Sequence, residues 1–404
     1  MWRFFQTGRK KRYNPSVSVS TEAWQKITRG CAEIISEKEL RAKLEKGKPL
    51  RIKLGVDPTA PDLHLGHLVA LRKLKTFQDL DHRIEFIIGD YTVRIGDPSG
   101  RSETRPSLSV EQIAEYCQTY RDQVFRILDP GKTIVTYNSV WFSALGVDGI
   151  LRLMRRTSLA QMLRRADFAK RIEEDQPISL LELLYPVLQG YDSVQVQADL
   201  ELGGTDQKFN LLMGRELQLE QAQEPQVIMM MPLLEGLDGV RKMSKSYGNY
   251  VAFNDPPNEM FGKLMSVPDA LLPKYVELLT DLNMAELKKL HPKEAKVRLA
   301  KTLTAQFHGT ETAEKAAAEF EQIFSKGSTP GDIPTHSASE SPIRITDLMV
   351  EAGVAPSKKE ARRLCEQGAV ELNGIRQSAD AQIPIRGEQI LKVGKRRFVR
   401  IVPK

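Results

Sequence analysis

Apolar runs with strand character alternate with helical patterns through the first two-thirds of the chain. Helical patterns fill most of the intervals between four strand-like segments, RIEFIIGDY (83–91), TIVTYN (133–138), SVQVQADLELGG (193–204) and VIMMMPLLE (227–235). This alternation predicts an α/β domain with a largely parallel sheet over about residues 50–235. In such a sheet, ligands bind beyond the carboxyl ends of the strands, near the point where the strand order reverses.

Composition changes along the chain and divides it into parts. Residues 325–342 are rich in Ser, Pro, Thr and Gly, which predicts a linker. Residues 256–324 carry helical patterns, and residues 1–21 contain five basic and no acidic residues. We expect the latter to be a disordered leader rather than a targeting segment. An α/β domain over 22–255 and a small domain over 343–404 complete the predicted organisation.

The net charge of +7 is spread unevenly, because residues 343–404 contain 13 basic and 7 acidic residues. This excess favours a polyanionic partner at the C-terminal part, although an ordinary charged surface would give the same count. Three widely spaced cysteines, Cys31, Cys117 and Cys365, indicate neither a disulfide framework nor a metal site and favour a reducing compartment. No run approaches the roughly 18 apolar residues that a membrane span needs.

The stretch PTAPDLHLGH (58–67) lies where the predicted strand RIKLGV (51–56) passes into a helix. His64 and His67 share one side of the helix start, beside the positive end of its dipole, which is the outline of a phosphate site. Asp62 could cap this helix, and Gly66, without a Cβ, would let a flat base lie against the backbone. The residues alone leave two other interpretations open, a metal site without a third ligand nearby and a purely structural pair of histidines.

A second candidate segment is LDGVRKMSKSYGN (237–249). Its two lysines, Lys242 and Lys245, are flanked by Gly236, Gly239 and Gly248, which predicts a mobile loop able to close on a polyphosphate. The chain has no G-x-x-x-x-G-K-[ST] loop, so phosphates must be held in another way.

HLGH and KMSKS, in this order and about 180 residues apart, resemble the two signature motifs of the class I aminoacyl-tRNA synthetases. IGDPSGR (95–101), YPVLQGYD (185–192) and LGGTDQKFN (202–210) resemble the versions in tyrosine-specific bacterial members. The resemblance covers about residues 30–400. It implies a Rossmann-like catalytic domain over 22–255, a helical anticodon-binding domain over 256–324, and activation of tyrosine with ATP followed by its transfer to tRNA.

The resemblance also assigns the phosphate end of the site. Thr59 and His64 would contact the phosphate chain, and Asp206 looks like the ribose-binding residue. The full set that it implies around ATP, including the catalytic lysines, is Asp57, Thr59, His64, Gly66, His67, Asp206, Gln207, Lys242 and Lys245. Magnesium would arrive with ATP, because the sequence shows no dedicated ligand cage and no resident metal is expected.

Tyr185, Gln189 and Asp192 follow i, i+4, i+7 spacing and share one helix face, a stripe that could otherwise simply face solvent. By resemblance, Tyr185 and Gln189 hold the substrate ammonium, and Asp192 accepts from the phenol hydroxyl. The remaining members of the implied tyrosine-binding set are Lys53, Thr92 and Asp97, and Asn138 is a weaker match.

Two positions depart from the family pattern. Lys53 stands where many tyrosine-specific members carry a tyrosine, and Glu201 stands where glutamine is common. A lysine and a glutamate that change together could form a compensating ion pair at the pocket wall. This departure puts the usual second hydrogen bond to the phenol in doubt, although a lysine could donate one.

Residues 343–375 resemble the RNA-binding fold first seen in ribosomal protein S-four, a small α+β domain. The helical segment SKKEARRLCEQG gathers the expected RNA-binding residues Lys358, Lys359, Arg362 and Arg363, and an ordinary basic surface helix is the alternative. The resemblance further implies a homodimer, the tRNA for tyrosine as partner and a cytoplasmic location.

Two other functions were weighed from the sequence. A synthetase for another aromatic amino acid, tryptophan, is disfavoured by Asp192 and by the C-terminal module. An RNA-binding factor on a retired synthetase scaffold is disfavoured because HLGH, KMSKS and GGTDQ are intact.

Overall fold

The computed structural model describes residues 19–99, 108–155, 157–325, 333–394 and 397–403. Almost all of the predicted leader, the end of IGDPSGR and part of the predicted linker lie outside these described residues. The chain divides into two compact units, residues 1–313 and residues 314–404. Across the ranges just given, no helix combines the length and the apolar character needed to cross a bilayer.

The first unit is built on a six-stranded sheet with the order β1-β6-β5-β2-β3-β4. Its strands are β1 (Glu33–Ile35), β2 (Arg51–Val56), β3 (Arg83–Ile88), β4 (Thr133–Tyr137), β5 (Leu200–Gly204) and β6 (Val227–Met231). All pairs are parallel except β1 with β6, so the predicted parallel sheet is confirmed. The strand order reverses between β2 and β5, which is where a ligand crevice is expected.

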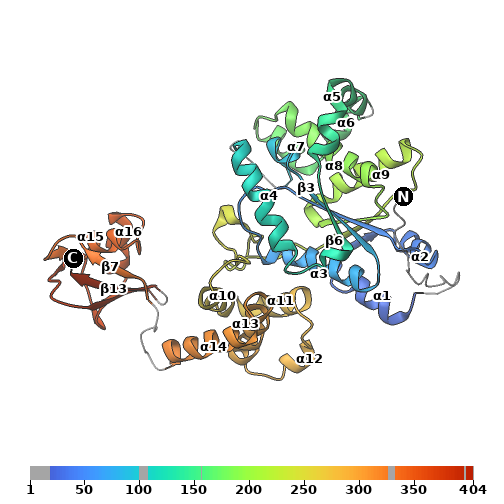
Figure 1. Ribbon diagram of the computed structural model, residues 1–404. Helices are drawn as coiled ribbons and strands as arrows, with labels where there is room; N and C mark the ends of the chain where they lie inside the picture. Colours follow the sequence, from blue (N-terminus) through green and yellow to red (C-terminus); the bar gives the residue numbers. More distant parts are fainter. Residues whose placement is uncertain (1–18, 100–107, 156, 326–332, 395–396, 404) are drawn as a thin grey trace, which may run out of the picture. The chain divides into compact units, whose positions relative to one another are not determined.

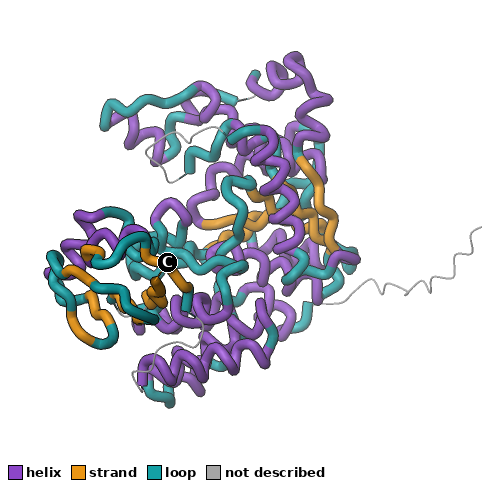
Figure 2. Tube along the Cα trace, turned by 60° about the vertical axis from the view of Figure 1, so that its left-hand side comes forward, coloured by secondary structure: helices purple, strands orange, loops and turns teal. Residues whose placement is uncertain are grey.

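Helices lie on both faces of this sheet (Figures 1 and 2). They are α1 (Thr21–Thr28), α2 (Glu37–Glu45), α3 (Leu65–Asp79), α4 (Val110–Val124), α5 (Ser139–Met154), α6 (Leu159–Met162), α7 (Ala166–Glu173), α8 (Leu180–Val196) and α9 (Lys208–Glu220). In α3 the apolar spacing of the sequence faces the core, because Leu68, Leu71, Leu74 and Phe77 are all buried.

The segment 193–204, which we expected to be a strand or to contain one, contains β5 at its end. Its first residues end α8, Gln197 adopts a positive φ of 51°, and β5 begins only at Leu200. Helix α8 extends this far because it packs closely on α9, where a Cβ on Gly190 would lie 3.0 Å from Gly214 N. Tertiary packing therefore overrides the strand preference of the valines in SVQV.

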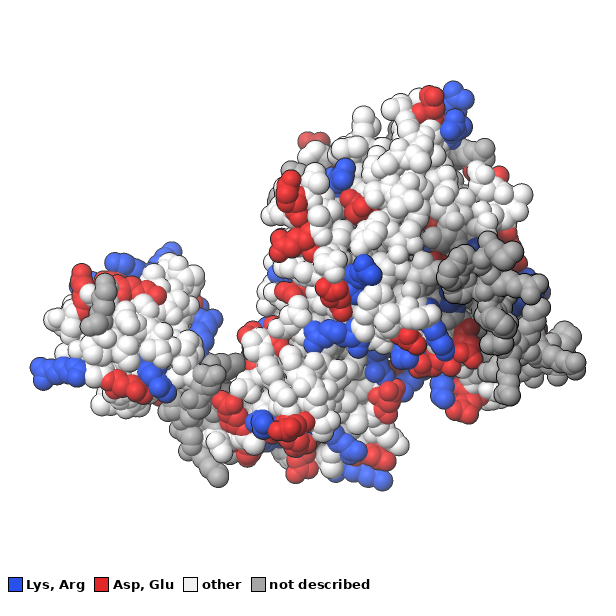
Figure 3. All heavy atoms as spheres, viewed as in Figure 1, with Lys and Arg blue, Asp and Glu red and all other residues white. Residues whose placement is uncertain are grey.

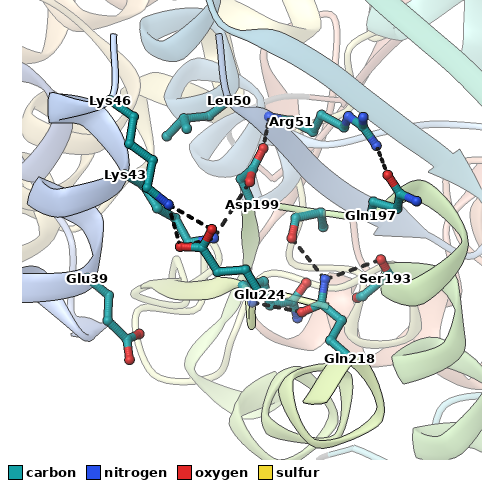
Figure 4. A network of polar contacts seen from close by, with 12 residues as sticks. Glu39, Lys43, Lys46, Leu50, Arg51, Ser193, Gln197, Asp199, Gln218 and Glu224 are labelled. Atoms are coloured by element: carbon teal, nitrogen blue, oxygen red, sulfur yellow. Dashed lines mark hydrogen bonds and ion pairs between the residues drawn. The ribbon is translucent and has the colours of Figure 1, made fainter. Parts of the chain in front are cut away.

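A polar network ties α2, the start of β2 and the end of α8 together (Figure 4). Arg51 N donates to Asp199 Oδ2 at 2.9 Å, and Lys43 Nζ lies 3.6 Å from Asp199 Oδ1. From α9, Gln218 Nε2 donates to the carbonyl of Ser193 at 3.4 Å. The network lies at the amino ends of β2 and β5, so it supports the strands from the edge opposite the crevice.

The rest of the first unit is helical, as predicted for residues 256–324. The helices are α10 (Pro257–Met265), α11 (Leu272–Leu279), α12 (Met284–Leu287), α13 (Pro292–His308) and α14 (Thr310–Ser325), within which the division between the units falls. Arg126, just beyond α4, joins this region to the α/β part, because its Nη2 donates to Phe307 O at 2.8 Å and its Nη1 to Asn254 Oδ1 at 2.9 Å.

The second unit combines two helices with short strands. Its elements are β7 (Thr335–Ala338), β8 (Ile343–Arg344), α15 (Ile345–Glu351), α16 (Lys358–Glu366), β9 (Val370–Leu372), β10 (Ile375–Arg376), β11 (Gln382–Ile383), β12 (Gln389–Val393) and β13 (Arg397–Pro403). The larger sheet has the order β10-β9-β12-β13-β7. The linker prediction was wrong for β7, because Thr335–Ala338 pair in parallel with β13 and belong to this sheet.

Candidate active site

A cavity of about 600 Å³ lies at the carboxyl ends of β2 and β5, where the strand order reverses. Both motif segments border it, although they are far apart in the sequence. Of the residues expected in the site, those that line the cavity are Asp57, Thr59, His64, Gly66, His67, Asp97, Tyr185, Gln189, Asp206, Gln207, Lys242 and Lys245. Lys53, Thr92 and Asp192 do not belong to this lining and are buried.

The two histidines of HLGH cap α3. His64 is the N-cap, with its Nδ1 accepting from Gly66 N at 3.1 Å, and His67 Nδ1 accepts in turn from His64 N at 3.2 Å. Asp62, our expected cap, instead accepts from Asn254 Nδ2 at 2.7 Å. That expectation was wrong because the helix begins at Leu65, which leaves the capping position to His64.

These caps fix the charge and the tautomer of both rings. Burial, reinforced by the nearby ammonium of Lys245, lowers the pKa of His67 to about 4 and the pKa of His64 well below its usual value. Both rings are therefore neutral near pH 7. Since each Nδ1 accepts a hydrogen bond, the ring proton lies on Nε2. The site thus gains two uncharged N–H donors.

Gly66 is required by the cap itself. A Cβ at this position would lie 2.9 Å from both Cε1 and Nδ1 of His64, so a side chain would push the capping ring away. Gly66 also lines the cavity, which keeps the expected contact with a base possible.

The chain that follows KMSKS returns to HLGH and pairs with it. Leu65 N donates to Val251 O at 3.0 Å, and Phe253 N donates to Leu63 O at 2.9 Å. The two motifs are therefore held together by backbone hydrogen bonds, independently of any ligand.

The two lysines of KMSKS have different surroundings. Lys242 Nζ forms an ion pair of 2.8 Å with Asp206, the expected ribose-binding residue. Lys245 Nζ is buried and has no hydrogen-bond partner among the described residues. Burial lowers the pKa of Lys245 to about 8, so the ammonium is still mostly protonated at pH 7. A buried, unpartnered cation beside two N–H donors suits a phosphate.

Asn249 fixes this loop and was missed in the sequence. Its Oδ1 accepts from Ser244 N at 2.8 Å, while its Nδ2 donates to Lys242 O at 3.1 Å and to Asp238 Oδ2 at 3.0 Å. Gly236, which the sequence suggested as a hinge, makes room for it, since a Cβ there would lie 2.2 Å from Asn249 Cγ. The positive φ values of Gly239 (76°) and Gly248 (62°) form the turns on either side.

Acceptors gather in another part of the cavity. Asp57 accepts from Tyr185 Oη at 3.0 Å and from Thr92 Oγ1 at 2.8 Å, and Asn138 Nδ2 donates to Thr92 Oγ1 at 3.0 Å. Burial and the adjacent Asp57 raise the pKa of Tyr185, so its hydroxyl stays protonated. Gly89 makes this pairing possible, because a Cβ there would lie 2.1 Å from Asp57 Oδ1.

A second chain of amides orders the neighbouring side chains. Gln207 Nε2 donates to Asp97 Oδ2 at 2.8 Å, and Asn210 Nδ2 donates to Gln207 Oε1 at 2.9 Å and to Gln189 Oε1 at 3.0 Å. Buried Arg165 donates to Asn210 Oδ1 at 2.7 Å. No sequence pattern indicated Arg165, because this residue is joined to the site through contacts that are distant in the chain.

Asp192 lies behind this part of the cavity with 4% of its surface exposed. Trp141 Nε1 donates to Oδ1 at 2.9 Å, and Asn138 Nδ2 lies 3.4 Å from Oδ2. Burial raises the pKa of Asp192 to about 7, although Lys53, Trp141 and Asn138 oppose this rise. Trp141 was also missed in the sequence.

Lys53 and Glu201 form the ion pair that the sequence suggested. Their Nζ and Oε1 atoms lie 2.7 Å apart, and the side chains are 0% and 1% exposed. Lys53 Nζ also donates to Gln189 O at 2.9 Å and to Ser193 Oγ at 2.7 Å. With three acceptors within 3 Å, the ammonium is occupied, so the suggested donation to a phenol is not supported.

The expected RNA-binding residues lie together on α16 of the second unit. Three of them have acidic partners, with 2.8 Å between Lys358 and Asp347, 3.4 Å between Arg362 and Asp380, and 2.6 Å between Arg363 and Glu360. Basic and acidic side chains are interspersed on the face of this unit seen in Figure 3. Three of the four expected RNA-binding side chains are therefore paired with a carboxylate in the protein without RNA.

No group of three or more His, Cys, Asp or Glu within the described ranges is arranged to hold a metal ion.

Known proteins show the same organisation. The model of the family "tRNA synthetases class I (W and Y)" matches residues 45–325, and that of the "Tyrosine--tRNA ligase SYY-like C-terminal domain" matches residues 319–400. Tyrosine–tRNA ligases of Moorella thermoacetica and Aquifex aeolicus are each 51% identical over 93% of this chain, which spans 94% and 97% of their lengths.

Solved structures agree. Tyrosyl-tRNA synthetase from Archaeoglobus fulgidus, in complex with L-tyrosine, aligns with a TM-score of 0.60 at 25% identity, over 74% of this chain and 99% of its own. Identity over nearly the whole chain, both family models and the pairing of HLGH with KMSKS lead to one conclusion. The chain belongs to the tyrosine branch of the class I tRNA synthetases.

Proposed function

We propose that this protein is a tyrosine–tRNA ligase. It activates tyrosine with ATP to tyrosyl-adenylate and pyrophosphate, and then transfers tyrosine to the 3'-terminal ribose of its tRNA. The observation that carries this assignment is one cavity with two chemically distinct groups of side chains. His64, His67 and Lys245 offer donors for phosphates, whereas Asp57, Asp97 and Gln189 offer acceptors for an ammonium.

The first step needs no protein nucleophile. A carboxylate oxygen of tyrosine forms a bond to the α-phosphorus while the bond from that phosphorus to the pyrophosphate oxygen breaks. In the second step a ribose hydroxyl attacks the carbonyl carbon, and AMP leaves. Catalysis therefore depends on positioning and on stabilising the charge that moves onto the pyrophosphate.

At the phosphate end, we assign the developing charge to the neutral Nε2–H groups of His64 and His67 and to the ammonium of Lys245. Thr59 contacts the phosphate chain. Asp206 binds the ribose once its ion pair with Lys242 opens, which frees that lysine for the pyrophosphate. The base lies over Gly66, near Gln207. Magnesium arrives bound to the ATP phosphates.

At the amino-acid end, Tyr185, Gln189 and Asp97 hold the substrate ammonium, with Thr92 and Asp57 supporting them. Asp192 accepts the hydrogen bond of the phenol. Phenylalanine has no hydroxyl to satisfy this acceptor, and the C-terminal domain model, which is of the tyrosine type, favours tyrosine over tryptophan. The comparisons support tyrosine ligation over both alternatives, a tryptophan enzyme and an RNA-binding factor without activity.

We infer that two chains associate through α5 to α8. This part of the surface exposes large apolar side chains and shows few charges in Figure 3. Those with 45% to 81% exposure are Val140, Val147, Leu151, Met154, Leu159, Ile172, Leu180 and Leu181. Apolar side chains gathered in this way mark an interaction surface. Light scattering should give twice the chain mass of 45.6 kDa, and a monomer mass at working concentration would contradict this.

The tRNA substrate contacts the second unit through α16. We place the protein in the cytoplasm, where its tRNA is expected and where its three free cysteines would stay reduced. Tyrosine-dependent exchange of pyrophosphate into ATP tests the proposed function. Exchange with tyrosine, but not with tryptophan, is the expected result. Pyrophosphate exchange that depends on tryptophan, or no exchange with either amino acid, would refute the proposed function.

A further inference from the structure

The buried pair of Lys53 and Glu201 needs an explanation beyond stability. Removing two charges from water costs free energy that their attraction often does not recover, so a buried ion pair is weak evidence of stabilisation. The two residues face each other across β2 and β5, in the register Lys53–Glu201. This is the point at which the strand order reverses, directly behind the cavity.

The ammonium of Lys53 reaches one turn of α8. Its contacts with Gln189 O (2.9 Å) and Ser193 Oγ (2.7 Å) bracket this turn. Gln189 lines the cavity, and Ser193 follows Asp192 directly. A single buried group therefore holds the backbone of one tyrosine-reading residue and the immediate neighbour of another.

The other side of the cluster is equally constrained. Ser193 Oγ donates to Glu201 Oε2 at 3.0 Å, Gln226 Nε2 donates to the same oxygen, and Gln218 holds the carbonyl of Ser193 (Figure 4). A Cβ on Gly214 would lie 2.9 Å from Ser193 Oγ. The glycine in α9 thus leaves just enough room for this polar cluster, and the turn of α8 has little freedom to shift.

We propose that Lys53 and Glu201 form a positioning pair for tyrosine recognition, which fixes the turn of α8 carrying Gln189 and Asp192 without touching the phenol. This inference rests on the proposed function, because it explains how the substrate is read. It assigns to Lys53 a role different from that of the tyrosine it replaces, since its ammonium is committed to α8 and β5.

The test separates positioning from mere stability. Lys53→Met alone leaves the Glu201 carboxylate buried and unpaired and should strongly destabilise the protein. The double variant Lys53→Met/Glu201→Met removes both charges and should recover stability to chemical denaturation. In this stable variant we expect KM for tyrosine to rise about tenfold, the tyrosine–phenylalanine ratio of kcat/KM to fall about tenfold, and KM for ATP to stay unchanged.

Another buried ion pair, between α7 and α8, provides a matched control. Arg171 Nη1 on α7 and Glu182 Oε1 in the first turn of α8 lie 2.7 Å apart, with side chains 4% and 6% exposed. In Arg171→Met/Glu182→Gln the glutamine retains the capping function of this position. This variant should keep the wild-type KM for tyrosine and the wild-type selectivity.

A stable double variant with wild-type KM for tyrosine and wild-type selectivity would overturn the proposal. If the double variant does not fold, Glu201→Gln, whose amide oxygen can still accept from Lys53, should shift KM for tyrosine in the same direction by a smaller factor. An unchanged KM there would also overturn it. Wild-type protein without tyrosine-dependent exchange would instead refute the proposed function, so the two failures are distinguishable.

Discussion

Trp141 donates its indole N–H to Asp192 at 2.9 Å and so joins α5 to the residue that α8 presents behind the cavity. The carboxylate is held from this side by Trp141, and its helix is held from the other side by Lys53. The Asp192 carboxylate therefore cannot reorient toward another hydrogen-bond donor. A substrate that leaves it unsatisfied therefore loses the full value of the hydrogen bond.

The first prediction concerns the phenol. Asp192→Ala should nearly abolish tyrosine activation and narrow the ratio of kcat/KM for tyrosine over phenylalanine by orders of magnitude, because the buried acceptor is gone. The affinity for ATP should be unchanged. Pyrophosphate exchange with each amino acid measures both effects. If folded Asp192→Ala protein rejected phenylalanine as strongly as wild type does, the acceptor of the phenol hydroxyl would have to be another residue.

The second prediction is a pH dependence. Burial raises the pKa of Asp192 to about 7, so the carboxylate becomes protonated as the pH falls through this value. The kcat/KM for tyrosine should fall on the acid side, and Asp192→Asn should lose this limb. The effect on stability has the opposite sign. Because the folded protein keeps the proton to a higher pH than the unfolded chain, this group's contribution to the free energy of unfolding decreases as the pH rises from about 4 to about 7. If Asp192→Asn kept the fall in kcat/KM at acid pH, that fall would have to arise from the titration of another group.

The third prediction separates the phosphate contacts from tyrosine binding. Lys245→Ala and Thr59→Ala should each slow adenylate formation, by up to about a hundredfold for loss of a donor used in the transition state. The Kd for tyrosine should remain unchanged. Lys46→Ala, which removes an exposed ammonium paired with Glu224, is the control. Weakened tyrosine binding, measured by equilibrium dialysis, would show that these residues lie elsewhere in the complex.

The fourth prediction tests how the KMSKS loop is held. Gly236→Ala should displace Asn249, since its Cβ would lie 2.2 Å from Asn249 Cγ, and Asn249→Ala should free the same loop directly. Both should lower the rate of adenylate formation without changing KM for tyrosine. Gly262→Ala is the matched control, because a Cβ there meets no atom within 4 Å. Equal rates of adenylate formation in all three variants and the wild type would mean that the hydrogen bonds of Asn249 to this loop have no part in catalysis.

The fifth prediction concerns the second unit. A variant that lacks the second unit should end before residue 333. A later end point would keep β7 but remove β13, the strand with which it pairs. Adenylate formation should then survive within a few-fold, while aminoacylation of tRNA falls steeply. Binding of tRNA to the full chain should weaken as salt is raised. Equal loss of both reactions would mean that the second unit supports the catalytic fold.

The features predicted from the sequence were those encoded by local spacing. The periodic apolar residues of α3 and the alternation of strands and helices were recognised in this way, whereas the two motifs were identified by their family resemblance. The segment 193–204 contains β5 as expected, but its first residues, SVQV, end α8 despite their strand preference. The antiparallel strand β1 is too short to carry a pattern.

Two of the three site residues that escaped prediction act across the fold. Trp141 and Arg165 contact partners on other elements, whereas Asn249 contacts its own loop, and none of the three belongs to a local pattern. The Lys53–Glu201 pair was suggested only because both positions depart from the family pattern together. Its actual partners on α8 could not be read from spacing.

The capping arrangement at the start of α3 has a consequence for product release. Both imidazoles use Nδ1 as a hydrogen-bond acceptor at the start of α3, and both remain uncharged. The side of the cavity that HLGH forms therefore attracts a polyanion only weakly. Positive charge comes from the lysines of one loop. If that loop moves away after the reaction, we expect pyrophosphate to lose its counter-ions in one step, with only the two neutral N–H groups left as contacts on this side.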